Sequence, residues 1–305
     1  MYQVAFYNLE NFFEIHPYSN TSPHEFSPNG KMKWGEYRFE KKVEKVGKAI
    51  KLLEEKTKIQ PLFIGLAEIE SKAILDRITS FRLLEDSNYK SIHFNSKYER
   101  GLDVALLYNA NLFEILASEP IEVLLKKTGS KKVYSRDILY VKGKVAEEIL
   151  HVFVNHWPSK RKGSAKKEAG RVEASFLVQT KIEAIRAENP DAKIIVLGDF
   201  NINPNTELMR DFALFSNLIN PMTSIYNENT GTLKFQGRWH LFDQILFSDN
   251  LLKSKSFKFQ SAHIFTDPYL IGTRNEKTKE PNRTYFGKNY IGGISDHFPV
   301  YALFE

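Results

Sequence analysis

The sequence predicts an α/β protein of the α+β type, in which β-sheets pack against each other and helices cover their outer faces. The first observation is that short apolar runs of strand length recur along the whole chain. The second is that few stretches have the spacing of amphipathic helices, so strands and helices do not alternate regularly. The third is a length of 305 residues with 42% apolar and 26% charged residues, an ordinary balance for a packed globular protein.

The expected strands are apolar runs bounded by polar residues. They comprise residues 4–7, 62–66, 104–108, 152–154, 194–197, 245–247 and 300–304. Two helices are expected where apolar residues recur at every third or fourth position. They are marked by Phe39, Val43, Val46, Ile50 and Leu53, and by Ala174, Val178, Ile182 and Ile185. The second helix should end before Pro190, and long surface loops are expected over residues 16–34 and 267–293.

No repeat, low-complexity tract or linker divides the chain, so residues 1–305 are expected to form a single domain and a monomer. No apolar run approaches the roughly 20 residues that cross a bilayer, so we expect no membrane insertion. The first residues lack the features of a signal peptide, which leaves a cytoplasmic protein or the mature form of an exported one. The absence of cysteine excludes disulfides, a thiolate zinc site and a cysteine nucleophile.

Polar residues suited to chemistry lie beside the predicted strands, where a sheet brings side chains to a common rim. They are Asn8, Glu10, Glu68, Glu70, Asn155, His156, Asp199, Asn201, Asn203, Asp243, Asp296 and His297. Carboxylate and amide oxygens suit Mg²⁺ or Mn²⁺, and Glu68 and Asp199 are the natural ligand candidates. The imidazoles of His156 and His297 can move protons near neutral pH. This combination favours hydrolysis of a phosphoester at a divalent metal site.

Each of these residues also has a simpler structural explanation. Asn8 could cap a turn, and Asp199 with Asn201 could form Asx-turns after a strand. His156 could be a half-buried ring beside Trp157, and Glu68 a solvated residue at a strand end. The chemical interpretation is favoured because acidic, amide and imidazole groups recur together at strand ends and not along the helices.

Two segments resemble the signature segments of the endonuclease/exonuclease/phosphatase superfamily, the group of deoxyribonuclease I, exonuclease III and the abasic-site endonucleases. They are Leu197-Gly198-Asp199-Phe200-Asn201 and Ser295-Asp296-His297-Phe298-Pro299. The remaining family motifs are matched by Tyr7-Asn8-Leu9-Glu10, Leu66-Ala67-Glu68, Ser135-Arg136-Asp137, Asn155-His156-Trp157-Pro158 and Leu241-Phe242-Asp243. One departure is Ala67, where the family usually carries glutamine; the change removes an amide and leaves Glu68 in place.

The resemblance implies a four-layer sandwich of two packed, mainly antiparallel sheets flanked by helices, with the site at one edge between the sheets. It implies a metal, Mg²⁺ or Mn²⁺, held mainly by Glu68, with Asn8 nearby and Asp296 close to the ion. Asp199 and Asn201 would orient the attacking water and the phosphate. His156 would stabilise charge or protonate the leaving group.

The resemblance also implies that Asp243 and His297 form a carboxylate–imidazole pair, and we expect His297 to be the general base. The expected substrate-binding residues are Arg136, Asn155, Lys160 and Arg161. Lys160 and Arg161 belong to a basic run beside His156 that either contacts a phosphate backbone or begins a solvated helix.

The substrate is less well defined, because the same catalytic set in this superfamily serves DNA, RNA, inositol phosphates and sphingomyelin. Residues 274–290 interleave basic and aromatic side chains, which could grip phosphates and stack bases. The chain has a formal net charge of +6, and together with this loop that charge favours a nuclease whose partner is a nucleic acid. The alternatives are a phosphatase or phosphodiesterase for a small phosphorylated molecule or lipid head group, and a non-catalytic binding protein on the same fold.

Overall fold

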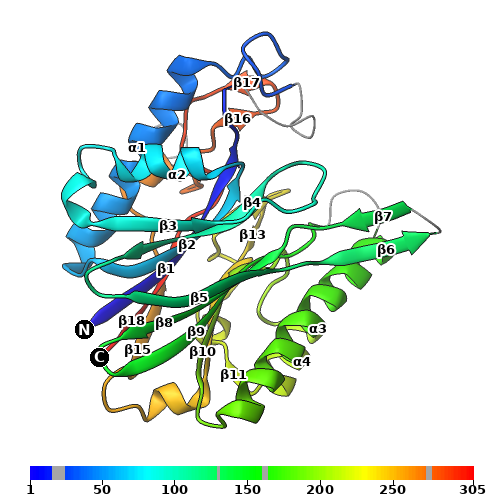
Figure 1. Cartoon of the computed structure of the whole chain (residues 1–305). Coiled ribbons are helices and arrows are strands. Elements are labelled where there is room, and N and C mark those ends of the chain that lie inside the picture. The colour runs from blue at the N-terminus through cyan, green and yellow to red at the C-terminus, as the bar shows by residue number, and fades with distance from the viewer. Residues whose placement is uncertain (16–24, 129–130, 160–163, 273–276) are drawn as a thin grey trace.

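A computed structural model describes residues 1–15, 25–128, 131–159, 164–272 and 277–305. Two six-stranded sheets lie face to face, and the long helices cover their outer sides (Figure 1). Both sheets are mixed, with one parallel pair each and antiparallel pairs elsewhere. The predicted sandwich of two mainly antiparallel sheets flanked by helices is therefore confirmed. Within the described residues no helix combines the length and the apolar composition needed to cross a membrane.

The first sheet has the order β15-β18-β1-β2-β4-β3 and the second the order β11-β14-β10-β9-β8-β5. Strands of the first are β1 (Tyr2–Phe12), β2 (Pro61–Ile69), β3 (Tyr89–His93), β4 (Asp103–Asn109), β15 (Phe259–Ile264) and β18 (Val300–Phe304). Strands of the second are β5 (Glu114–Ile121), β8 (Ile138–Val145), β9 (Glu148–His156), β10 (Lys193–Asp199), β11 (Leu218–Ile219) and β14 (Asp243–Ser248). All seven predicted strands are present, and several run further than their apolar cores.

Smaller elements complete the described chain. The helices are α1 (Glu36–Thr57), α2 (Lys72–Thr79), α3 (Ser164–Glu188), α4 (Glu207–Phe215) and α5 (Pro268–Ile271), with 3-10 turns at Glu85–Ser87, Pro221–Ser224 and Asp249–Leu252. The two-stranded hairpins are β6 (Leu124–Thr128) with β7 (Lys131–Tyr134), β12 (Leu233–Phe235) with β13 (Arg238–His240), and β16 (Tyr285–Phe286) with β17 (Asn289–Tyr290). The predicted loop at 267–293 therefore contains α5 and one of these hairpins.

Three groups of buried apolar side chains separate the four layers. Along β1, Val4 and Phe6 point between the sheets, whereas Ala5 and Tyr7 pack under α1 and α2. Along β10, Leu197 points between the sheets and its neighbour Val196 packs under α3 and α4. Because successive side chains of a strand point to opposite faces, strands that are apolar throughout must be covered on both sides. That requirement produces the helix–sheet–sheet–helix order.

Both predicted helices form where their apolar stripes meet a sheet. The stripe of α1, from Phe39 to Leu53, is buried against the first sheet. Helix α1 ends at Thr57, and the next residue, Lys58, adopts a left-handed conformation with φ of 60°. The stripe of α3 packs on the second sheet, and the helix ends at Glu188, ahead of Pro190 as predicted.

Candidate active site

Both sheets bring catalytic residue types to the same edge of the sandwich. In the second sheet, Asp199 pairs with His156 on one side and with Asp243 on the other, so the three side chains stand in a row across β9, β10 and β14. In the first sheet, Asn8 of β1 pairs with Ala67 of β2, next to Glu68. The predicted convergence at strand ends is therefore present. Asn8, Glu68, His156, Asp199 and Asp243 lie within their strands, whereas Asn201 follows β10 and Asp296 and His297 precede β18.

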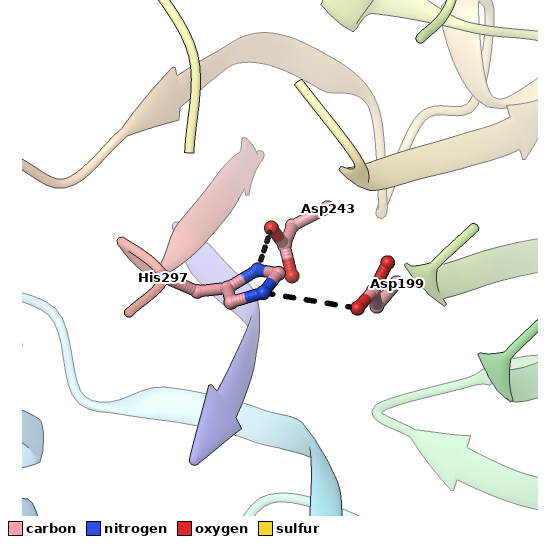
Figure 2. Close-up of side chains that lie close together, drawn as sticks. All are labelled: Asp199, Asp243 and His297. Atoms are coloured by element: carbon pink, nitrogen blue, oxygen red, sulfur yellow. Dashed lines mark hydrogen bonds and ion pairs between the residues drawn. The ribbon is translucent and has the colours of Figure 1, made fainter. Parts of the chain in front are cut away.

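Asp243 and His297 form a buried carboxylate–imidazole pair (Figure 2). Nδ1 of His297 lies 2.6 Å from Oδ2 of Asp243, and the hydroxyl of Thr232 donates to the same oxygen. Burial alone would lower the pKa of His297, but the charge and hydrogen bond of Asp243, followed by the charges of Asp296 and Asp199, raise it well above the usual range. The site therefore favours the imidazolium form of His297.

Asp199 faces the other nitrogen of the same ring (Figure 2), with its Oδ2 4.0 Å from Nε2 of His297. Its Oδ1 accepts a hydrogen bond from the backbone nitrogen of Asn201 at 2.9 Å, and its Oδ2 accepts one from Nδ2 of Asn8 at 3.0 Å. Burial, and then the charge of Asp243, raise the pKa of Asp199 to about 7. A carboxylate with this pKa can accept a proton near neutral pH.

His156 stands on the far side of Asp199. Its Nε2 lies 3.5 Å from Oδ2 of Asp199 and 3.9 Å from Oε1 of Glu68. Burial, and then the charge of Arg136, lower the pKa of His156 well below its usual value. The two histidines therefore differ in charge: His156 is held neutral, whereas His297 is held protonated.

Glu68 and Asp296 present carboxylates to the cavity from the first sheet and from the turn before β18. Oε2 of Glu68 accepts a hydrogen bond from the backbone nitrogen of Asn11 at 2.6 Å. Oδ1 of Asp296 lies 3.8 Å from Nε2 of His297. Asn8 is placed differently, because its Nδ2 donates to Asp199 and its Oδ1 accepts from the backbone of Glu10 at 3.0 Å. Its amide orients Asp199, and because the Asn8 oxygen has a second lone pair, its expected place near the metal stays a prediction.

The donor set fits a hard divalent cation. Among the described residues, Asp199, Asp243 and His297 offer ligand atoms within 4.8 Å of one another. The short hydrogen bond between Asp243 and His297 already accounts for much of this proximity. Glu68 and Asp296 add oxygens at the cavity wall, and Mg²⁺ and Mn²⁺ prefer such carboxylate oxygens.

The side chains of Glu68, Asp199, Asp296 and His297 line a cavity of about 420 Å³, and Asp243 contacts the His297 ring without lining the cavity. Three arginines, Arg100, Arg136 and Arg283, line the same cavity and add positive charge to it. The guanidinium of Arg136 is 4.7 Å from the ring centre of Tyr98, and Arg100 donates to Oδ1 of Asn11 at 2.7 Å. The remaining wall is mixed: it includes the apolar and aromatic side chains of Leu233, Phe235, His240 and Phe242 and the polar ones of Asn11, Ser159, Asn201 and Gln236.

Of the residues predicted to bind substrate, Arg136 lines the cavity and Asn155 does not. Asn155 is fully buried behind the cavity, where its amide accepts from Nε1 of Trp157 and donates to the Phe153 and Leu197 carbonyls. Gly198, with φ of 157°, allows this close approach, since a Cβ there would meet the Asn155 carbonyl at 2.2 Å. Asn201 does line the cavity, and its Nδ2 donates to the Trp157 carbonyl at 2.9 Å. Lys160 and Arg161 lie outside the described residues.

The loop before Ser295, predicted to grip phosphates and stack bases, brings only some of its basic and aromatic side chains to the cavity. Arg283 lines the cavity, but Tyr285 is buried between Phe26 and Trp34, and its hydroxyl donates to the Met32 carbonyl. A ring packed into the core is not available to stack a base, so the expectation is wrong for Tyr285. Arg274 lies outside the described residues.

Two residues of the cavity could not be recognised as site residues from the sequence. Arg100 lies in an irregular segment between β3 and β4, where one arginine among several charged residues marks nothing. Phe235 belongs to the short β12–β13 hairpin, and 47% of its surface is exposed. Both reach the cavity only through the packing of segments distant in sequence.

Comparisons with known proteins agree with this architecture. The structure is similar to TDP2 from C. elegans (14% identity, TM-score 0.61, covering 99% of this chain and 74% of that one). It is also similar to D. rerio TDP2 complexed with a single-strand DNA product (14%, TM-score 0.59, covering 100% and 98%). A mannosyl-6-phosphatase from Bacteroides thetaiotaomicron is similar at 17% identity (TM-score 0.58, covering 100% of both chains).

No curated protein matches the chain in sequence. A family model matches residues 3–305, which is nearly the whole chain, and its description is the endonuclease/exonuclease/phosphatase family. The match includes every strand of both sheets that contributes to the cavity, except that it begins one residue after the start of β1. The chain belongs to the endonuclease/exonuclease/phosphatase family.

Proposed function

We propose that this protein is a divalent-metal-dependent phosphoester hydrolase that cleaves phosphodiester bonds of a nucleic acid. The observation that carries the proposal is the cavity in which the Asp243–His297 pair faces Asp199 (Figure 2), beside Glu68, Asp296 and three arginines. Carboxylates for an ion, groups that exchange a proton and cations for phosphoryl oxygens are what in-line attack of water on a phosphoester needs.

Glu68 and Asp296 would hold the metal, with Asp199 close by. When bound, Mg²⁺ or Mn²⁺ would neutralise the charge that develops on the phosphoryl oxygens and acidify the attacking water. Arg136, with 5% of its surface exposed, is fixed at the cavity wall and can hold a phosphoryl oxygen without the entropic cost of ordering a free side chain.

The proton roles follow from the electrostatics of the buried groups. The sequence alone favoured His297 as the base, but a ring whose pKa is raised well above its usual value holds its proton at neutral pH. Asp199, whose pKa is raised to about 7, is the better proton acceptor. In the proposed mechanism Asp199 takes the proton of the water as the water oxygen bonds to phosphorus, and the His297 imidazolium, oriented by Asp243, stabilises the anionic transition state. The P–O bond to the leaving oxygen breaks, and that oxygen takes a proton from solvent.

A nucleic acid is favoured as the substrate by the aromatic side chains of the cavity. Phe235 and Phe242 line the same cavity as the arginines, and aromatic rings together with cationic side chains suit a base next to a phosphate. The net charge of +6 acts in the same direction, because it raises the local concentration of polyanions.

A phosphomonoesterase acting on a small sugar phosphate is the second candidate. Three guanidinium groups at one cavity of about 420 Å³ match the higher charge of a phosphomonoester better than the single charge of a diester. The structural similarity to a mannosyl-6-phosphatase is compatible with this alternative at the level of the fold.

A substrate panel tests both candidates. Purified protein is incubated with Mg²⁺, Mn²⁺ or EDTA and with plasmid DNA, single-stranded DNA, RNA, bis-p-nitrophenyl phosphate, inositol phosphates and sugar phosphates. We expect cleavage of a nucleic acid with either metal and none with EDTA. Hydrolysis of the monoesters alone would establish the second candidate, and the absence of any hydrolysis with both metals would refute the proposed activity.

A further inference from the structure

We propose that Lys42, a buried lysine of α1, is a positioning residue that holds the two metal-binding carboxylates, Glu68 and Asp296, in their working geometry. This inference rests on the proposed metal site. Lys42 lies on the apolar stripe of the helix, between Phe39 and Val46, and is only 2% exposed. A lysine is almost never buried this completely unless its ammonium group has partners.

The ammonium group of Lys42 joins two segments behind the cavity. It donates to the backbone carbonyl of Glu10 at 2.5 Å and to Oγ1 of Thr284 at 2.9 Å. Nζ also lies 5.2 Å from the ring centre of Phe12 and 6.0 Å from that of Trp34. The side chain therefore has a fixed position, and α1, β1 and the chain before β16 are tied together at one atom.

The segment held by the Glu10 carbonyl has an unfavourable backbone conformation. Glu10 and Asn11 have φ values of 47° and 50°, and the pairing of β1 with β2 is irregular between Asn8 and Phe12. Glu68, with φ of 64°, occupies a matching irregularity of β2. Left-handed conformations of residues other than glycine persist only where the surrounding structure holds them. Lys42 supplies one such restraint, at the first of these residues.

This distorted segment positions Glu68. The backbone nitrogen of Asn11, one residue after the carbonyl that Lys42 binds, donates to Oε2 of Glu68 at 2.6 Å. If the Glu10 carbonyl were released, the Asn11 nitrogen would be free to turn away, because a single peptide unit contains both atoms. Glu68 would then lose the donor that fixes its carboxylate.

The Thr284 contact extends the same restraint to Asp296. The backbone nitrogen of Thr284 donates to Oε2 of Glu10 at 2.5 Å, and its hydroxyl donates to the Ile294 carbonyl at 3.4 Å, two residues before Asp296. Lys42, Glu10 and Thr284 thus form a closed set of contacts that is linked to Glu68 through the Asn11 nitrogen and to the segment of Asp296 through the Ile294 carbonyl. Groups that orient metal ligands in this way typically change metal affinity about 10- to 100-fold when they are removed.

The sign of the effect separates positioning from simple electrostatics. The positive charge of Lys42 acts on Glu10, Glu68 and Asp296. If charge were its only contribution, replacing it with a neutral side chain would remove a repulsion toward the cation and tighten metal binding. If Lys42 positions the ligands, the same replacement weakens binding, although a positive charge has been removed.

Calorimetric titration of Mn²⁺ into the metal-free full-length protein distinguishes positioning of the ligands from a purely electrostatic effect of Lys42. We expect Lys42→Met, which keeps an unbranched side chain of similar size without the charge, to weaken Mn²⁺ binding by about tenfold or more. Lys48→Met is the matched control, because Lys48 lies on the same helix with its side chain exposed, and it should bind Mn²⁺ like the wild type. Circular dichroism shows whether each variant is folded.

An unchanged or lower dissociation constant for Mn²⁺ in folded Lys42→Met overturns the inference. If Lys42→Met does not fold, Thr284→Val tests the same role, because it deletes one acceptor of the lysine and keeps a branched side chain. Severalfold weaker Mn²⁺ binding by Thr284→Val supports positioning, and wild-type binding refutes it. A wild type that binds no Mn²⁺ would instead contradict the metal site itself, and this inference with it, so the two failures are distinguishable.

Discussion

Asp243 determines the charge of the His297 ring as well as its orientation. Its carboxylate is fully buried and 2.6 Å from Nδ1 of that ring, so its charge is not screened by water. The same charge raises the pKa of Asp199. One carboxylate outside the cavity lining therefore affects both Asp199, the proton acceptor of the proposed mechanism, and the His297 imidazolium that stabilises its transition state.

The Asp243→Asn substitution tests this dual effect through the pH dependence of kcat. In the wild type, we expect the rate to rise with pH through about 7 as Asp199 loses its proton, and to fall at higher pH as His297 loses its own. Removing the Asp243 charge lowers both pKa values. Both limbs of the profile should therefore move to lower pH, and kcat should fall by about 10²- to 10⁴-fold. A profile that keeps its shape and position would contradict the assignment.

Arg136 is expected to bind the phosphate rather than to act in proton transfer. Arg136→Met should raise KM for a single-stranded oligonucleotide and lower by about one the slope of log KM against log salt concentration, because one phosphate contact is lost. Arg210→Met provides the control, since Arg210 is exposed on α4, away from the cavity. Equal salt slopes for Arg136→Met and the wild type would exclude a phosphate contact.

At the scale of single elements, the β8–β9 pair contains a buried titratable group that belongs to the fold and not to the site. His151 of β9 is 7% exposed, and its Nδ1 lies 2.8 Å from the hydroxyl of Tyr140 on β8. Burial, and then the charges of Lys142 and Lys181, lower the pKa of His151 to about 4. The folded protein therefore takes up this proton later than the unfolded chain does as the pH falls.

The lowered pKa of His151 makes the folded protein less stable at acidic pH. Between pH 6.5 and 4 the unfolded chain binds the proton and the folded protein does not, so the free energy of unfolding decreases as the pH falls through this range. The contribution of His151 is at most about 3 kcal/mol. His151→Asn keeps an acceptor for Tyr140 and cannot titrate there. Urea unfolding at pH 7, 5.5 and 4 should show a smaller loss for His151→Asn, and equal losses would contradict the assignment.

Elements with a strong apolar pattern could be predicted, and elements without one could not. The runs at 62–66 and 194–197 are central strands buried on both faces, which is why their sequences are continuously apolar. In contrast, β5 is an edge strand with its residues mostly exposed, and its short apolar run at residues 115–117 was not predicted as a strand. The short helices α2 and α4 were missed because their apolar stripes span only two turns.

At the scale of the whole molecule, the position of the site could be predicted but its full membership could not. Asp199, Asp243 and His297 stand in short sequence motifs, and the rule that strand ends converge brings them together. Arg100 and Lys42 stand in no motif. Lys42 interrupts an apolar helical stripe, and that signal could have identified it as a buried, partnered lysine.

The most direct test of the whole account is the initial rate of phosphodiester hydrolysis at pH 7 with saturating Mn²⁺, for the wild type and for Asp199→Asn. Asparagine keeps the shape of the side chain and cannot accept the proton of the attacking water, so the proposed mechanism predicts a loss of about 10²- to 10⁴-fold in kcat with the fold intact. A folded Asp199→Asn protein that hydrolyses the substrate at the wild-type rate would contradict the account.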